Sequence, residues 1–157
     1  MRRSAMVLPV LAGLLSGCAA MPNAVVAVPK NAQKPLYQID RLYRAPGNTV
    51  RWVFANDLER ATTLQFEFEQ GTQNVFESGF ELVCVQVNEK TLKSAKQKSK
   101  PRSSGNGPSF PLVAGTTAGP SVCTASLQIR GDATSGEHRY RILQDGVEKQ
   151  DPVIIIR

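Results

Sequence analysis

The chain has 157 residues, of which 41% are hydrophobic, with 19 basic against 13 acidic side chains and a formal net charge of +6. Six basic residues lie between positions 90 and 102 and two at positions 2 and 3, so elsewhere eleven bases face thirteen acids. This distribution excludes a polycationic chain, and the roughly 115 to 120 residues from position 37 onward are enough for one domain with its own core.

The N-terminal segment has the three parts of a secretory signal. Two arginines at positions 2 and 3 precede an apolar run over residues 6–15, and small residues follow at positions 16 and 17. The apolar run is too short for a transmembrane helix, which needs roughly 20 residues. We therefore expect a cleaved signal and no retained membrane span.

The four residues that end this segment carry a resemblance. Leu15-Ser16-Gly17-Cys18 resembles the lipobox of bacterial lipoproteins. The resemblance implies that residues 1–17 are removed and that the sulfur of Cys18 carries diacylglycerol, with a further acyl chain such as palmitate on its amine. Since Ala19 is not the aspartate linked to inner-membrane retention, it also implies a lipid anchor in the bacterial outer membrane, facing the periplasm. The alternative is an ordinary secretory signal, with Cys18 a bystander.

The segment after the lipobox has no sustained period. Residues 18–36 mix proline, alanine and polar residues. We expect this lipidated N-terminus to be a flexible tether that holds the folded part away from the bilayer. The domain then spans residues 37–157.

The remaining sequence is dominated by strands. Leu64, Phe66 and Phe68 alternate with polar residues, which predicts one buried and one solvated face, whereas residues 80–87 are apolar on both sides and suit a central strand. Further strands are predicted at 50–56, 121–129 and 138–144, and Asp145-Gly146 is a hairpin turn signal before a last strand at 153–156. The predicted fold is all-β, a sandwich of about seven strands.

The end of the chain has a second resemblance. An aromatic alternating strand, a turn at Asp145-Gly146 and an apolar terminal strand resemble the final hairpin of small immunoglobulin-like domains in bacterial envelope proteins. This resemblance implies an immunoglobulin-like β-sandwich, and a fold of this kind does not by itself indicate a function.

Two cysteines lie inside the domain. Cys84 and Cys123 each fall on the apolar side of a predicted strand. In an exported protein we expect a disulfide between them, which we predict links the opposing sheets. The alternatives are two free buried thiols, or a metal or redox pair, although metal needs more ligands and there is no Cys-x-x-Cys motif.

A basic stretch interrupts the strands. We expect residues 88–108 to form a long loop, with a helical turn near residues 91–98, because their apolar residues are few and badly spaced. One reading is a solvated insertion. The other is a contact with a polyanion or partner, such as anionic lipid, lipopolysaccharide phosphates or an acidic protein face. The basic residues concerned are Lys90, Lys93, Lys96, Lys98, Lys100 and Arg102.

Residues suited to catalysis are few. His138 is the only histidine and is predicted at the surface of a strand, and Glu67 and Glu69 fit the wet face of theirs. Trp52 and the phenylalanines are expected in the core. We predict no enzyme, no cofactor, no metal and no nucleic acid, since aromatic residues for base stacking are not interleaved with the lysines.

Two functional hypotheses follow. The first is a lipoprotein held in the membrane by its acyl chains, acting as a non-catalytic adaptor or accessory module of an envelope assembly such as a secretion system. Its partner is an envelope protein that docks on a strand edge or on the basic stretch. The alternative is a lipoprotein that binds a small ligand or glycan, or that inhibits a hydrolase.

Overall fold

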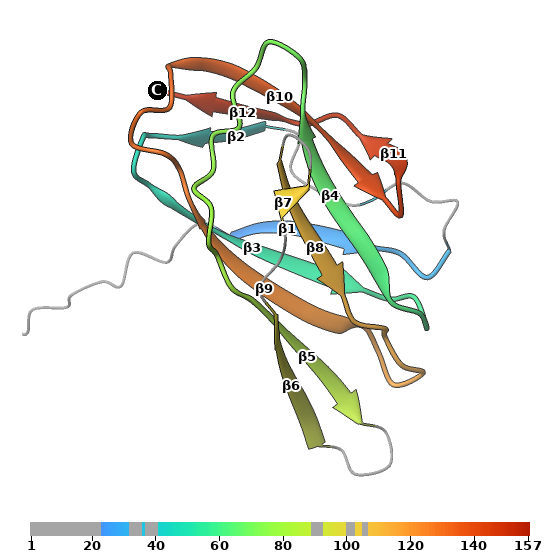
Figure 1. Cartoon of the computed structure of the whole chain (residues 1–157). Helices are drawn as coiled ribbons and strands as arrows, with labels where there is room; N and C mark the ends of the chain where they lie inside the picture. The colour runs from blue at the N-terminus through green and yellow to red at the C-terminus, as the bar shows by residue number, and fades with distance from the viewer. Residues whose placement is uncertain (1–22, 32–35, 37–40, 89–92, 100–102, 105–106) are drawn as a thin grey trace, which may run out of the picture.

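The computed structural model describes residues 23–31, 36, 41–88, 93–99, 103–104 and 107–157, which form strands and no helix (Figure 1). None of these residues belongs to a helix able to span a bilayer. The strands are β1 (Asn23–Val28), β2 (Arg41–Arg44), β3 (Thr49–Asn56), β4 (Thr62–Phe68), β5 (Leu82–Asn88), β6 (Lys93–Ser99), β7 (Ser103–Ser104), β8 (Gly107–Leu112), β9 (Ser121–Gln128), β10 (Gly136–Gln144), β11 (Val147–Gln150) and β12 (Val153–Ile156).

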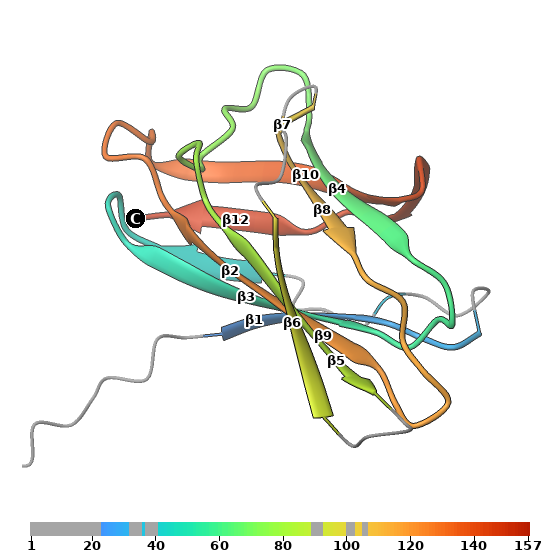
Figure 2. The same ribbon diagram turned by 60° about the horizontal axis from the view of Figure 1, so that its bottom comes forward.

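Among the described residues the strands form two sheets packed face to face (Figures 1 and 2). The five-stranded sheet has the order β1-β3-β9-β5-β6. The seven-stranded sheet has the order β2-β12-β10-β4-β8-β7, with β11 paired to β10. The predicted all-β sandwich is confirmed, and it holds more strands than the seven expected.

Seven of these strands follow the immunoglobulin order. That order places strands A, B, E and D in one sheet and C, F and G in the other. Here β1-β3-β9-β5 and β4-β10-β12 occupy the corresponding places in space and in sequence. Two features depart from it: β1 runs parallel to β3, and the disulfide joins neighbouring strands of one sheet.

Alternation of apolar and polar residues explains the core. Each main strand turns every second side chain inward, as in the pattern of β4, and the inward aromatic residues meet between the sheets. The Phe66 ring lies 4.8 Å from the rings of both Trp52 and Phe110 and 5.0 Å from that of Tyr140. As predicted, Trp52 belongs to the core, with 2% of its surface exposed.

The predicted tether is wrong where β1 lies. Residues Asn23–Val28 pair with β3 along its length, from Asn23 opposite Arg51 to Val28 opposite Asn56. Ala24, Val26 and Val28 are fully buried in the core. The alanine and valine side chains on one side of this strand fill the core, and its backbone pairs with β3, so both contacts stabilise it. The sandwich therefore includes residues 23–28, which precede the predicted start at residue 37.

The turn predicted at the end of β10 is confirmed. Asp145 and Gly146 both have positive φ, 49° and 83°, and the strands resume pairing at Gln144 opposite Val147. The Asp145 carboxylate accepts hydrogen bonds from Arg60 and from the Thr62 hydroxyl, each at 2.8 Å. It also accepts one from the backbone N–H of Thr63 at 2.8 Å. This turn therefore fixes the beginning of β4.

Glycine is required where β8 begins. A Cβ atom at Gly107 would overlap the carbonyl oxygen of Phe66. The close approach of these two backbones lets β8 lie beside β4 and puts Phe110 into the aromatic core. By contrast, a Cβ atom at Gly131 would meet no atom within 4 Å.

Candidate functional site

Part of the predicted basic loop is a strand. Residues Lys93–Ser99 form β6, which pairs antiparallel with β5 along its whole length and is an edge of the five-stranded sheet. The prediction of a loop with a helical turn is wrong here because β5 supplies a backbone template that needs no apolar side chain from its partner. Figures 1 and 2 show the β5–β6 hairpin extending away from the other sheet. Lys90, Lys100 and Arg102, like Cys18, lie outside the described residues.

The two domain cysteines form a disulfide, as predicted, with an S–S distance of 2.05 Å. Cys84 on β5 lies directly opposite Cys123 on β9. The expectation that this bond links the opposing sheets is wrong, because both strands belong to the five-stranded sheet. The disulfide instead fastens the β5–β6 hairpin to the centre of its own sheet.

Part of the outward side of the five-stranded sheet is apolar. Its residues form two rows across the strands. One row runs from Val25 to Val53, Thr124 and Val83, and the other from Ala27 to Ala55, Val122 and Val85. We call these eight residues the valine face. Their partners on the same strands, such as Cys84 and Trp52, point into the core, so the eight side chains face away from it.

The outward side of the other sheet is charged and internally paired. Arg141 on β10 lies opposite Glu67 on β4, with their side chains 2.9 Å apart, and also contacts Glu148 at 3.3 Å. Arg139 contacts Glu137 at 3.6 Å. A solvated face of this kind is usual for an antiparallel sheet. The valine face is therefore the exception that needs a functional account.

Basic side chains border the valine face. Lys98 lies opposite Val83 and Lys96 opposite Val85, so both continue the two rows onto β6, and both are exposed. Lysines on an edge strand also discourage sheets from pairing edge to edge. Lys98 contacts Glu81 at 3.2 Å in an exposed pair, whose net stabilisation is about 0 to 1 kcal/mol. Arg51, two residues before Val53 on β3, is exposed on the same side of the sheet.

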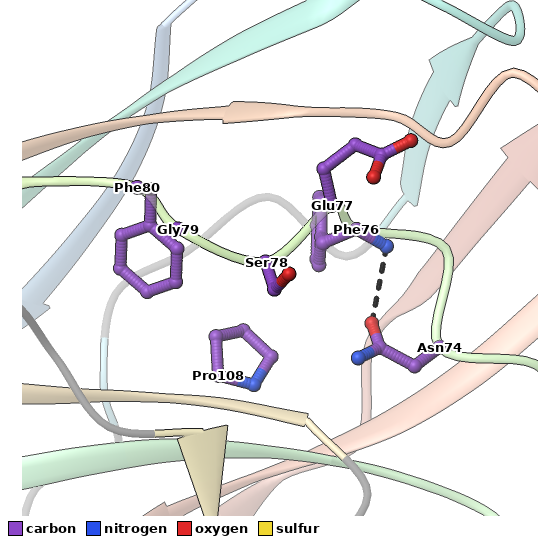
Figure 3. Close-up of a pocket in the computed structure, with 7 residues that line it drawn as sticks. All are labelled: Asn74, Phe76, Glu77, Ser78, Gly79, Phe80 and Pro108. Atoms are coloured by element: carbon purple, nitrogen blue, oxygen red, sulfur yellow. Dashed lines mark hydrogen bonds between the residues drawn. The ribbon is translucent and has the colours of Figure 1, made fainter.

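A hollow lies between the β4–β5 connection and β8 (Figure 3). It has a volume of about 190 Å³ and is lined by Asn74, Phe76, Glu77, Ser78, Gly79, Phe80 and Pro108. The Asn74 side-chain oxygen accepts a hydrogen bond from the Phe76 N–H at 3.0 Å, which closes one end. Further hollows in the described part of the chain have volumes of about 210 and 150 Å³. Drug-sized ligands usually occupy about 300 to 1,000 Å³.

Two titratable side chains, His138 and Tyr140, lie in the described core. His138 was predicted at the surface, but its ring is buried, with 4% exposed, and its Nε2 lies 2.8 Å from the carbonyl oxygen of Thr134. Burial raises the pKa of the Tyr140 hydroxyl. Within the described residues no group of three or more histidine, cysteine, aspartate or glutamate side chains has the arrangement of a metal site.

No protein-family model matches this chain, and no curated protein is similar to it.

The valine face was not predicted from the sequence, although part of its signal was present. Residues 80–87 are apolar on both sides, and this pattern predicts a central strand. Val25 and Ala27 lie in the predicted tether, and Val122 directly precedes Cys123, the first of the predicted core-facing residues of its strand. Only the pairing of distant strands brings these side chains into rows.

Proposed function

We propose that this chain is an outer-membrane-anchored periplasmic lipoprotein and a non-catalytic adaptor of an envelope assembly such as a secretion system. It docks on an envelope protein through the valine face. The observation that carries the proposal is the difference between the two outer faces: the five-stranded sheet presents rows of valine and alanine, whereas the seven-stranded sheet presents paired charges.

The anchor is the acylated Cys18, proposed from the basic start, the apolar run and the Leu15-Ser16-Gly17-Cys18 motif. Each buried methylene of an acyl chain contributes about 0.8 kcal/mol of membrane affinity, so two or three chains anchor the protein stably. Such an anchor confines the sandwich to the membrane and raises the effective concentration of any partner there.

The size of the valine face fits the core of a docking surface. Neighbouring strands lie about 4.8 Å apart, so the four strands that carry the valine face cover about 19 Å, and two rows cover roughly 14 Å along them. The resulting area of roughly 270 Å² approaches that of apolar patches that often have a function in monomers. A stable interface buries about 800 Å² on each partner, so the rim with Lys96, Lys98 and Arg51 must contribute as well. This rim favours a partner with carboxylates around an apolar centre.

The alternative of a small-ligand or glycan binder has less support. The hollow of about 190 Å³ near Phe80 is smaller than typical ligand sites. A second hollow, beside Cys84, has a similar volume of about 210 Å³. The aromatic side chains that a glycan site would use, such as Trp52 and Phe66, are buried in the core. Inhibition of a hydrolase would use the same docking surface and is one form that the partner contact can take.

The proposal is tested on the full chain in its own envelope. A photoreactive amino acid at Thr124, at the centre of the valine face, is expected to form an adduct with one envelope protein. The matched control carries the photoreactive amino acid in place of Val147, an exposed apolar position on β11 of the other sheet. Adducts of equal yield from both positions, or none from Thr124, contradict the docking surface. Mass spectrometry of the mature N-terminus tests the anchor separately, and an unmodified Cys18 thiol contradicts it.

A further inference from the structure

The distance between the anchor and the valine face limits where a partner can sit. β1 begins at Asn23, five residues after Cys18, and it is hydrogen-bonded to β3 from its first residue. Five extended residues span at most about 18 Å. A tether of 19 residues, as the sequence alone suggested, would reach about 65 Å. The paired β1 therefore removes most of the freedom that such a tether would give.

The strand next to the anchor is itself part of the docking surface. Val25 and Ala27 on β1 start the two rows of the valine face. The extended chain from Cys18 to Val25 is at most about 25 Å long, and the sheet spans about 19 Å from β1 to β6. Detachment of β1 from the sheet costs free energy, because it would expose the buried side chains of Ala24, Val26 and Val28 to water.

We infer that the valine face contacts a protein embedded in, or firmly bound to, the same membrane as the lipid anchor, at the level of that membrane's periplasmic surface. This inference rests on the proposed function, in particular on acylation of Cys18. The partner surface is flat and apolar, with carboxylates placed to meet Lys96 and Lys98. A soluble periplasmic protein that docks far from the bilayer is out of reach.

A protein fits the valine face better than the bilayer itself. Side chains that enter the membrane interface are typically tryptophan, tyrosine, phenylalanine or leucine, which protrude beyond their neighbours. The valine face consists of valine, alanine and threonine, and their short branched side chains give a smooth surface suited to packing against another sheet or a helix.

The experiment combines the photoreactive residue at Thr124 with a series of linkers. Flexible Gly-Ser segments of about 6, 12 and 20 residues are inserted between Ala20 and Met21, and a 20-residue segment added after Arg157 is the matched control. Because effective concentration falls roughly as the −3/2 power of linker length, extension from about 5 to 25 residues is expected to lower the adduct yield about tenfold. The control is expected to leave it unchanged. The protein partner in the adduct is expected to leave the membrane with detergent and to resist washing with high salt.

The outcomes separate this inference from the proposed function. An adduct with a soluble protein, or a yield that is the same for every linker, overturns the inference and leaves the adaptor proposal intact. An adduct with lipid overturns it in favour of the bilayer as occupant. If Cys18 is acylated and Thr124 gives no adduct in any variant, the docking surface itself is wrong. Disulfide formation and an unchanged unfolding temperature show that each variant is folded.

Discussion

Removal of the Cys84–Cys123 disulfide tests how the docking surface is held. The double substitution Cys84→Ala/Cys123→Ala cuts the bond between β5 and β9 without removing a strand. The bond closes a loop with a sequence separation of 39 residues. In the chain-entropy model, release of such a loop increases the entropy of the unfolded chain by about 13 cal/mol/K, which lowers the free energy of unfolding by about 4 kcal/mol at 25 °C.

This loss is large enough to measure directly. A domain of about 135 residues gains roughly 280 cal/mol/K on unfolding, so a loss of about 4 kcal/mol lowers Tm by about 14 °C in calorimetry. Because the bond holds the β5–β6 hairpin to its own sheet, its removal should destabilise that hairpin before the rest of the domain. In hydrogen exchange the amides of Val83 and Val85 are expected to lose protection before those of Phe66 in the other sheet. A Tm decrease below about 4 °C would refute the entropic reasoning, and an equal loss of protection in both sheets would refute its local part.

The remaining predictions concern the face, a backbone contact and a carboxylate. Val122→Lys, at a position 38% exposed, should change the free energy of unfolding by no more than about 0.5 kcal/mol yet abolish the Thr124 adduct, whereas Val147→Lys should leave the adduct unchanged. Gly107→Ala should lower stability by about 2 kcal/mol or more in thermal unfolding, while Gly131→Ala stays near neutral. Although partial burial opposes it, hydrogen bonds from Thr63, Arg60 and Thr62 hold the pKa of Asp145 below its usual 3.8. The stability that this carboxylate contributes is present above pH 3.8 and is lost as pH falls through the lowered pKa, so Asp145→Asn should flatten the acid limb of an unfolding-versus-pH curve.

Several parts of the fold were readable from the sequence for local reasons. The alternation at Leu64, Phe66 and Phe68 identifies β4, because a strand between core and solvent requires it. Asp145-Gly146 identifies a hairpin, because few other residues accept positive φ at both positions. Cys84 and Cys123 were identified as a pair from their inward positions and the exported context.

The parts that were missed depend on distant partners. Strand β6 contains lysine, serine and glutamine with no apolar alternation, and it is ordered by the backbone of β5. Strand β1 is flanked by prolines, and it pairs in parallel with a strand more than 20 residues away. No local turn signal therefore predicts this pairing. The same limit applies to the choice of sheet for Cys84 and Cys123. The alternation predicts that both side chains point into the core, but it does not indicate which of the two sheets each strand belongs to.

The placement of β1 links the proposed anchor to the docking surface in a way that a free tether would not. Each of its residues from Ala24 to Val28 belongs either to the core or to the valine face. A change that detaches β1 would therefore lengthen the connection to Cys18 and remove the first member of both rows in one step. With a free tether, anchor length and docking surface would vary independently. If Cys18 is acylated as proposed, force on this anchor acts along the edge of the proposed docking surface. A bound partner and the paired strand β1 should then protect each other from release.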